Sequence, residues 1–514
     1  MLNRILIVCM IGMASQIAAQ TIDWTFTYDG PDSASDYGRA IARSGNSVCI
    51  VGELDMGSHD DAVAISVNGY NGNLNWVSTF DGGANDYDNF EDVVICGNYV
   101  CAIGTSAITS SSDYFTVCGF DLSSGYLMWT WRPPTSAGDD NDDQAICTDG
   151  NFVYAAGDVS NSLNDTATVV KIDPSTGNAS WEKHVIRGHF QTIDFGGDLM
   201  VYSAGYRTVS SGVHDFAVAR VSAETGIVNW WISWDLGSDD DEAYVVKYGA
   251  DGGLYAGGRG GTDAGGNLDF IVMKIDRFNP NPPDWFKQFN GSNTVDACHC
   301  LLLGDDGYLY AGGSLNNLGT VIKLNASNGD IVWQNYYASS VMGIVWGNDD
   351  FLYASTGTEL IKINPSSGNT QWTLPFSVQY DIVKGISDIL YIGGRYAGDV
   401  AIWRVDPYGP GIVENQTEIG RSNYFNLSQN FPNPVFSRTI IKYYIANPCK
   451  VELKLFNIAG RQIAILANES QTPGYYQVNW DIRNLSKTLL PNGVYFYRLT
   501  GGEFTDTKKL VIMR

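Results

Sequence analysis

The chain has 514 residues, enough for two or more domains with substantial cores. It contains 57 glycines and 12% aromatic but only 17% charged residues, which favours an all-β protein rich in turns over a helical one. The formal net charge is −25, so nucleic acid and anionic membranes are poor partners for it.

Residues 1–20 have the features of a secretory signal peptide. Arg4 supplies a charged start, residues 5–14 form a short apolar core, and Ala18 and Ala19 provide small residues for cleavage. An apolar run of this length is too short to anchor a protein in a membrane. We therefore expect export through the inner membrane, removal of residues 1–20, and no transmembrane anchor.

Residues 143–181 form a unit of four short predicted strands, QAICTD, NFVYAAG, ATVVKID and ASW. Turn-forming residues such as Asp149-Gly150-Asn151 separate the strands, and β-branched and aromatic residues fill them. One such sheet has two apolar faces that it cannot bury alone. A unit of this kind is therefore expected to recur along the chain.

Tryptophans after the last turn of the unit show that it recurs eight times. Their spacings are 52, 53, 52, 49, 55, 48 and 39 residues, in or near the range of propeller blades. The second strand recurs with the unit, for example as VCIVG, FVYAAG and YLYAGG. The tryptophans are Trp24, Trp76, Trp129, Trp181, Trp230, Trp285, Trp333 and Trp372.

The order of the strands predicts how the repeats close into a ring. Trp24 precedes any complete copy, and no tryptophan strand follows the last third strand, which ends near Asp406. The strand around Trp24 is therefore expected to lie beside residues 399–405, which would remove free sheet edges. We predict an eight-bladed β-propeller over residues 21–407. Seven blades is the alternative, because the last two repeats are short, and an open solenoid is disfavoured.

The composition changes after the repeats. Residues 408–423 form a polar linker with glycine and proline, and residues 424–514 lose the repeat. This tail has 11 basic against 5 acidic residues, whereas the remainder of the chain has 20 against 51. About seven short alternating strands predict a small Ig-like β-sandwich for residues 424–514.

Three motifs in the tail resemble the C-terminal sorting domain of the type IX secretion system. They are LSQNFPNP (427–434), VELKLFN (451–457) with Gly460 and Arg461, and GVYFYRL (493–499) followed by KKLV (508–511). The resemblance implies recognition by the outer-membrane translocon, then secretion or surface attachment, often with removal of the tail. A plain Ig-like binding module is the alternative. The residues matching the sorting signal are Asn430, Pro432, Asn433, Pro434, Gly460, Gly493, Tyr495, Arg498, Lys508 and Lys509.

The propeller copies resemble bacterial β-propeller repeats of the SBBP type. The ending from Thr176-Gly177 to Trp181 is also similar to the tryptophan-docking blades of quinoprotein propellers. That second resemblance would imply adjacent cysteines stacked on a quinone, and the sequence has no Cys-Cys pair. The resemblances therefore imply an architecture and not an activity, and no organic cofactor is expected.

Cysteines are expected to be buried thiols and not a disulfide framework. Most of the eight that follow the signal peptide stand where other copies carry small apolar residues. Cys298-His299-Cys300 has no second Cys/His pair at zinc-like spacing. Strand alternation would place His299 on the opposite face from both thiols. A core strand is therefore favoured over a metal site there.

Aspartates gather in the connectors that lead from each tryptophan strand to the next copy. If these connectors share one rim, their carboxylates would concentrate negative potential at the channel mouth and offer oxygen ligands to Ca²⁺. The alternative is that each aspartate caps a turn by accepting backbone N–H groups. The candidate ligand-binding residues are Asp36, Asp88, Asp139, Asp142, Asp143, Asp239, Asp241 and Asp296.

Catalytic motifs are sparse. The five histidines occupy unlike positions of different repeats, and no G-x-S-x-G elbow is present. We therefore favour a non-enzymatic surface or secreted scaffold that binds an extracellular glycan or protein. The alternative is a glycan-active lyase or hydrolase at the acidic channel mouth, which would need convergent His, Tyr, Lys or carboxylate groups.

Overall fold

The computed structural model describes residues 21–512 apart from short gaps. The predicted signal peptide and linker lie outside the described residues, so both stay predictions. The gaps are 32–34, 85, 110–111, 134–143, 161–164, 211, 238–239, 262–267, 291–293, 377–378, 386–388, 408–425, 428–429, 431–432, 434, 436–437, 446–448, 459, 472–473, 483–489 and 503.

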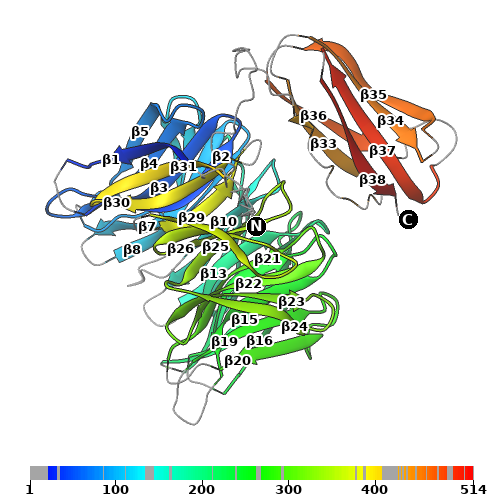
Figure 1. The fold of residues 1–514 in the computed structure, drawn as a ribbon. Helices are drawn as coiled ribbons and strands as arrows, with labels where there is room; N and C mark the ends of the chain where they lie inside the picture. Colours follow the sequence, from blue (N-terminus) through cyan, green and yellow to red (C-terminus); the bar gives the residue numbers. More distant parts are fainter. Residues whose placement is uncertain are drawn as a thin grey trace, which may run out of the picture.

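β-Strands are the regular elements of the described residues (Figure 1), which confirms the predicted all-β class. A search of the same residues for an apolar helix of membrane-spanning length found none. The strands up to Phe195 are β1 (Thr21–Tyr28), β2 (Tyr37–Ser44), β3 (Ser47–Asp55), β4 (Asp60–Asn68), β5 (Leu74–Phe80), β6 (Asp92–Cys96), β7 (Tyr99–Thr109), β8 (Ser112–Asp121), β9 (Leu127–Trp131), β10 (Ala145–Thr148), β11 (Val153–Ser160), β12 (Asp165–Ile172) and β13 (Ala179–Phe195).

The repeats continue in the same way up to Asp406. These strands are β14 (Met200–Ser210), β15 (Val213–Ser222), β16 (Val228–Trp234), β17 (Glu242–Tyr248), β18 (Leu254–Gly260), β19 (Asp269–Ile275), β20 (Trp285–Phe289), β21 (Ala297–Leu303), β22 (Tyr308–Leu315), β23 (Leu318–Asn325), β24 (Ile331–Tyr337), β25 (Val341–Trp346), β26 (Leu352–Thr356), β27 (Glu359–Ile363), β28 (Thr370–Pro375), β29 (Gln379–Lys384), β30 (Leu390–Tyr396) and β31 (Asp399–Asp406).

Antiparallel pairing of successive strands makes the sheets. Five sheets contain four consecutive strands each: β2–β5, β6–β9, β17–β20, β21–β24 and β25–β28. Strands β10–β16 form one sheet of seven. In that sheet β13 is 17 residues long, pairs with β12 as far as Arg187, and pairs with β14 from Gly188 onward.

The two ends of the repeat region meet in one sheet of strand order β1-β31-β30-β29. Trp24 in β1 lies opposite Arg404 in β31, so the pairing predicted for the strand around Trp24 is confirmed. The first strands of the repeats contact one another in the order β2, β6, β10, β13, β17, β21, β25 and β29, and β29 contacts β2 again.

Tryptophans join neighbouring repeats. Trp76 Nε1 donates a hydrogen bond to the carbonyl oxygen of Leu122 in the following repeat, at 2.9 Å. The Trp76 ring lies against Gly125, where φ is 72° and where an added Cβ would come within 2.4 Å of the ring. Only glycine fits this turn, because the turn needs positive φ and leaves no room for a side chain. The same bond to the next repeat is made by Trp24, Trp129, Trp181, Trp230, Trp285 and Trp333.

Tyrosines of the second strands are the largest buried side chains of the repeats. Tyr154 is fully buried, and its hydroxyl donates to Asp149 Oδ2 at 2.9 Å. Burial without this partner would leave a polar hydroxyl unsatisfied. Equivalent tyrosine–aspartate bonds are made by Tyr202, Tyr255, Tyr310 and Tyr353.

All eight cysteines in the described part of the chain are free thiols. The prediction for Cys298 and Cys300 is wrong in one respect, because the two thiols do not share a face. The strand pairing shifts between Cys298 and Cys300, as in a β-bulge. Cys298 packs in the apolar cluster of Val245 and Tyr255, whereas Cys300 packs against another cluster.

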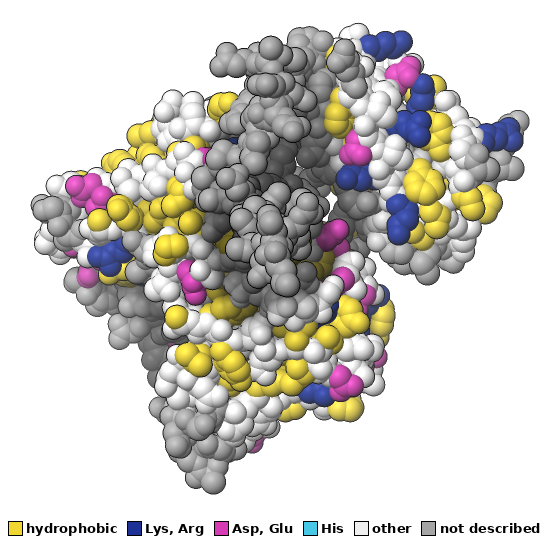
Figure 2. All heavy atoms as spheres, in the orientation of Figure 1, with side chains coloured by type: hydrophobic (Ala, Val, Ile, Leu, Met, Phe, Trp, Pro, Cys, Tyr) yellow, Lys and Arg dark blue, Asp and Glu magenta, His cyan; other side chains and the backbone are white. Residues whose placement is uncertain are grey.

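The C-terminal strands form two antiparallel sheets, of strand order β32-β33-β36 and β35-β34-β37-β38. The two sheets share a core that includes Ile441, Leu453 and Tyr497. Lys and Arg side chains gather over these strands in Figure 2. An Ig-like topology stays a prediction. The strands are β32 (Asn426–Leu427), β33 (Arg438–Ile445), β34 (Cys449–Asn457), β35 (Gln462–Gln471), β36 (Gly474–Asp481), β37 (Gly493–Gly501) and β38 (Phe504–Ile512).

Candidate functional site

Four of the predicted rim aspartates occupy equivalent places in their repeats. Asp36, Asp88, Asp241 and Asp296 are fully buried. Each backbone N–H donates to the carbonyl of a residue directly before an aspartate of the third strand, as Asp88 does to the carbonyl of Asp60, which precedes Asp61, at 2.8 Å. Each connector is thereby tied to the hairpin that joins the second and third strands of the repeat that it leaves.

The carboxylate of each of these four aspartates accepts one hydrogen bond from its own connector and one from the second strand of the next repeat or the turn that follows it. Asp88 accepts the backbone N–H of Gly82 and of Ala107, both at 2.9 Å. Burial raises the pKa of Asp88 to about 6, although these two N–H groups act to lower it. The corresponding N–H donors are Gly30 and Asp55 for Asp36, and Leu236 and Gly261 for Asp241. Asp296 accepts the Thr294 hydroxyl and the N–H of Asn316.

Among the described residues, no two of these connector aspartates belong to the same cluster of potential metal ligands. Asp36 lies with Asp29 and Asp399, and Asp88 lies separately with Asp61 and Asp81. Asp139, Asp142, Asp143 and Asp239 lie outside the described residues, so their part in a site stays a prediction.

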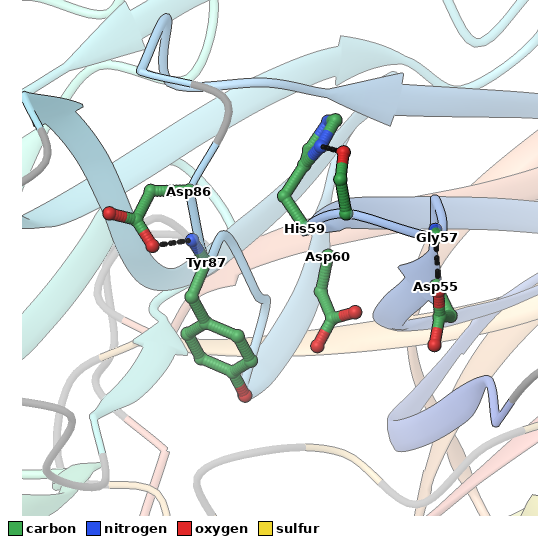
Figure 3. Close-up of a pocket in the computed structure, with 7 residues that line it drawn as sticks. Asp55, Gly57, His59, Asp60, Asp86 and Tyr87 are labelled. Atoms are coloured by element: carbon green, nitrogen blue, oxygen red, sulfur yellow. Dashed lines mark hydrogen bonds between the residues drawn. The ribbon is translucent and has the colours of Figure 1, made fainter.

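An acidic pocket of about 290 Å³ opens beside Asp88, between the β3–β4 hairpin and the connector from β5 to β6. In Figure 3 the side chains of Asp60 and Tyr87 point in the same direction, and Asp86 points away from them. We call this the acidic pocket. It is lined by Asp55, Gly57, Ser58, His59, Asp60, Asp86 and Tyr87.

Negative charge dominates the acidic pocket. Burial raises the pKa of Asp60, and the nearby charges of Asp55 and Glu53 raise it further. The Arg39 guanidinium, which contacts the lining residue Tyr87, is already held by Glu53 at 2.7 Å and Glu91 at 3.3 Å. A cation that enters the pocket would therefore meet carboxylates whose negative charge is not fully neutralised.

Tyr87 forms the boundary between the acidic pocket and the Arg39 ion pairs. Its hydroxyl accepts hydrogen bonds from Arg39 and Asn89, each at 3.2 Å. Burial raises the pKa of Tyr87 to about 12, and the charge of Glu53 adds to this effect. The hydroxyl therefore stays protonated at neutral pH and can donate to a ligand or to Glu53.

A second group of polar residues lies at the corresponding place between β14–β15 and β17. His214 Nδ1 is 3.2 Å from Asp240 Oδ1 and 3.5 Å from Glu242 Oε1. Arg259 from β18 contacts the other oxygens, Asp240 Oδ2 at 2.6 Å and Glu242 Oε2 at 3.1 Å. We call His214, Asp240, Glu242 and Arg259 the His214 cluster.

Aromatic rings flank the His214 cluster on both sides. The Tyr206 ring stacks on His214 with a centroid separation of 4.1 Å. Tyr244 donates to Glu242 Oε2 at 2.9 Å, and its ring stacks on His299 at 5.8 Å. Burial lowers the pKa of His299 to about 4, so this imidazole is neutral at pH 7.

The His214 cluster balances its own charges. A hydrogen bond to Glu242 raises the pKa of His214. Burial opposes ionisation of Glu242, but the bond to His214 and the charge of Arg259 lower its pKa to about 2. Burial and the charge of Glu242 raise the pKa of Asp240. Two cationic groups thus face two carboxyls, in contrast to the acidic pocket.

Sequence analysis selected the neighbouring Asp239 and Asp241 and did not join Asp240 or Glu242 to His214 or Arg259. It also missed Asp55 and Asp60. One signal was available: HDFAVARV and DDAVAISV align, so His214 stands where the earlier repeat has Asp60. The carbonyl groups of both residues accept the N–H of the connector aspartate.

The residues of the predicted sorting signal draw the two ends of the tail together. Asn433 Oδ1 accepts the N–H of Val511 at 2.8 Å, and Asn433 Nδ2 donates to the carbonyl of Lys509. The buried Asn430 donates its N–H to the Tyr497 hydroxyl at 2.7 Å. Pro432 and Pro434 lie outside the described residues.

The remaining sorting-signal residues lie on or beside β34, β37 and β38. Gly460, with φ of 74°, makes a turn after β34, and Gly493 begins β37. Tyr495 is buried and donates to the carbonyl of Pro491. Arg498 donates to Thr507, and Lys508 and Lys509 belong to β38.

Two segments of the chain match models of known protein families. Residues 429–513 match the model described as a secretion system C-terminal sorting domain. Residues 286–374 match the model described as outer membrane protein assembly factor BamB. No curated protein matches the chain.

Solved structures share the fold of the repeat region. Sqt1 of Saccharomyces cerevisiae is 11% identical, with a TM-score of 0.54 over 74% of this chain and 98% of Sqt1. Sqt1 of Chaetomium thermophilum, bound to the N-terminus of the ribosomal protein L10, is 10% identical, with a TM-score of 0.52 over 73% and 98%. Quinohemoprotein alcohol dehydrogenase from Comamonas testosteroni is 10% identical, with a TM-score of 0.51 over 81% and 79%.

At these identities the solved structures establish the fold and not an activity. The sorting-domain match adds a route of export and an outer-surface or secreted location. The chain is therefore a β-propeller protein that carries a type IX secretion C-terminal sorting domain.

Proposed function

We propose that this exported propeller is a binding scaffold and not an enzyme. Its acidic pocket takes a cationic group of an extracellular partner, a lysine or arginine side chain or an amino sugar. The observation that carries the proposal is the concentration of Asp55, Asp60 and Asp86 around one opening, beside which the Arg39 guanidinium is engaged by Glu53 and Glu91. Desolvated carboxylates in such a place attract a cation more strongly than surface carboxylates do.

The size of the acidic pocket fits a single group and not a long ligand. Its volume of about 290 Å³ is at the lower end of ligand pockets, which begin near ~300 Å³. A side chain or one sugar ring fills such a volume. Specificity for a larger partner would then come from the surrounding loops of the same face.

A direct test measures the binding of two cationic probes to the purified full-length protein. Fluorescent trilysine represents a protein partner, and a labelled chitosan oligosaccharide represents a glycan. We expect at least one probe to bind, and D55N/D60N/D86N to weaken that binding at least about tenfold, or about 1.4 kcal/mol. The charge-matched control E224Q/D284N/D305N removes three exposed carboxylates elsewhere and should have little effect.

Four outcomes decide the matter. Binding of trilysine alone assigns a protein partner, and binding of chitosan alone assigns a glycan. Equal losses in the pocket variant and in the control would mean that overall charge, and not the acidic pocket, attracts the probes. Failure of both probes to bind would overturn the proposal.

We also propose that the ring has eight blades and that residues 21–407 form one domain. The support is the double role of β13, which ends one set of four strands and begins the next. Counted in this way, the strands from β1 to β31 make eight sets of four. The cyclic contacts from β2 through to β29 and back to β2 support closure. A crystal structure with seven blades would contradict the count.

A glycan-active enzyme is the second candidate, and the His214 cluster favours it. Glu242 lies 3.5 Å from His214 Nδ1 and accepts a hydrogen bond from the Tyr244 hydroxyl, and these are residue types that lyases and hydrolases use. The candidate predicts release of reducing ends or unsaturated sugars from a polysaccharide panel. A protein that binds chitosan without cleaving any member of the panel would exclude it.

Delivery by the tail has its own test. We expect a truncation that lacks residues 424–514 to fold and to remain in the periplasm, because the sorting domain is the part that the translocon recognises. Fractionation of cells into periplasm, surface and medium measures the effect. Normal amounts of the truncated protein in the medium would overturn the role of the tail, and limited proteolysis would show whether 21–407 and 424–514 separate as domains.

A further inference from the structure

The His214 cluster directs three metal-ligand atoms toward one point. His214 Nδ1 lies 3.2 Å from Asp240 Oδ1 and 3.5 Å from Glu242 Oε1. The three atoms all lie within 4.8 Å of one another. A tetrahedral Zn²⁺ ion with bonds of about 2.0–2.1 Å requires ligand atoms about 3.3 Å apart, and both measured distances are close to that value.

The other carboxylate oxygens are held from behind. Arg259 contacts Asp240 Oδ2 and Glu242 Oε2, and the Tyr244 hydroxyl also donates to Glu242 Oε2 at 2.9 Å. Oδ1 and Oε1 are thereby left on the side that faces the imidazole. Hydrogen bonds of this kind to the outer oxygens orient carboxylate ligands in metal sites.

The backbone fixes the three ligands before any ion arrives. His214 and Asp240 form an isolated parallel β-bridge, and the N–H of Asp241 donates to the carbonyl of His214 at 3.1 Å. Glu242 begins β17, and its side chain is 8% exposed. Asp240 is 39% exposed, so the cluster has one open side through which an ion and a water molecule can enter.

The two groups of three aspartates differ from this cluster. In each group the connector aspartate, Asp36 or Asp88, already uses both carboxylate oxygens to accept backbone N–H groups. Neither group contains an imidazole. The combination of one nitrogen and two carboxylate oxygens suits a borderline first-row ion, whereas Ca²⁺ prefers oxygen ligands alone.

We propose that His214, Asp240 and Glu242 bind one divalent transition-metal ion of the Zn²⁺ type. Arg259 and Tyr244 hold the two carboxylates in the orientation that this binding requires. The site is separate from the acidic pocket, so it does not depend on the function proposed for that pocket. The alternative is that the cluster binds no metal and that His214 and Arg259 only neutralise the two carboxylates.

Calorimetric titration of the chelator-treated full-length protein with ZnCl₂ tests the proposal. We expect one equivalent to bind, His214→Gln to weaken the affinity at least about 100-fold, and D240N to weaken it at least about tenfold. Tyr244→Phe keeps all three ligands and removes only the bond to Glu242, so its expected loss is about tenfold. His184→Gln is the control, because the His184 side chain is 50% exposed and lies outside the cluster.

Cobalt replacement supplies a readout that does not depend on any variant. The wild-type protein with Co²⁺ should show weak visible bands of a nitrogen–oxygen site, and Zn²⁺ should displace them. Absence of Zn²⁺ binding by the wild type, unchanged affinity in His214→Gln and D240N, or a thiolate charge-transfer band would each overturn the proposal. Equal weakening by His184→Gln would identify adventitious surface binding and would overturn it as well.

Discussion

The acidic pocket and the His214 cluster occupy the same place in two repeats, but their charges are arranged differently. Asp60 in β4 and His214 in β15 each stand directly before an aspartate of the third strand, and the carbonyl of each accepts the N–H of a buried connector aspartate. Around Asp60 the carboxylates outnumber the available cations. Around His214 two cationic groups face two carboxyls.

This difference separates architecture from function within one repeat. The connector aspartates Asp88 and Asp241 bond the backbone in the same way at both places. The residues on either side of them differ between the two repeats, and they add side chains to a frame that is the same in both. A propeller can therefore carry an open anionic pocket in one repeat and a preorganised polar cluster in another.

Replacement of Asp88 by alanine should cause the largest change. The substitution leaves the N–H groups of the partly buried Gly82 and the buried Ala107 without acceptors, at a cost of up to about 1–3 kcal/mol each. We expect the free energy of unfolding to fall by about 2–4 kcal/mol, measured by urea denaturation.

Asp60→Ala is the matched control for that experiment. It removes a carboxylate from the same loop, but the backbone carbonyl that binds Asp88 stays in place. The control should lower stability by no more than about 0.5 kcal/mol. Equal destabilisation by the two substitutions would contradict the division between architectural and pocket aspartates.

Most of the repeat architecture could be predicted from the sequence, because its signals are local and recur. The tryptophans and the Tyr154-type second strands recur from copy to copy, so the period can be read directly. The position of Trp24 before the first complete copy predicts a strand beside residues 399–405, and its pairing with Arg404 confirms this. The bulge between Cys298 and Cys300 could not be foreseen, since strict alternation gives no sign of an inserted residue.

The candidate sites were harder to predict, because their residues come from separate hairpins and connectors. Asp60 and Tyr87 are distant in the sequence and line one pocket only because the connector is tied to the β3–β4 hairpin. An acidic run in the sequence also does not show which carboxylates accept backbone N–H groups. Asp88 and Asp60 therefore look alike until the hydrogen bonds are known.

Ser58→Arg should add a cation to the acidic pocket and so make its balance of charge more like that of the His214 cluster. Ser58 is exposed and lines the pocket, so an arginine there adds a cation without burying it. We expect the affinity for whichever cationic probe binds to fall about tenfold, or about 1.4 kcal/mol. Gln371→Arg adds the same charge on an exposed outer strand, and fluorescence anisotropy should show little change for it.

The pH dependence of probe binding should distinguish Asp60 from ordinary surface aspartates. Burial and the charges of Asp55 and Glu53 raise its pKa, so Asp60 takes up a proton at a higher pH than the usual value of about 4. Trilysine stays cationic throughout. Its affinity should therefore fall several-fold on acidification, beginning above pH ~4.

His59 also faces the acidic pocket, and its protonation would add positive charge there. The titration is therefore performed in a His59→Gln background, with D60N in the same background as the control. The fall in trilysine affinity that begins above pH ~4 should be absent in the D60N control. Identical pH profiles for the two proteins would show that Asp60 does not govern binding.

The smallest expected effect is a gain in stability from D60N itself. Because folding raises the pKa of Asp60, the folded protein holds this proton more tightly than the unfolded chain, and stability falls as pH rises through that range. At pH 7 the charged Asp60 is a cost, and asparagine removes it. We expect a gain of about 0.5 kcal/mol after allowance for solvent screening, which should vanish near pH ~4. Loss of stability at pH 7 would instead mean that the Asp60 carboxylate is held by a favourable partner, and the acidic pocket would then resemble the His214 cluster in its balance of charge.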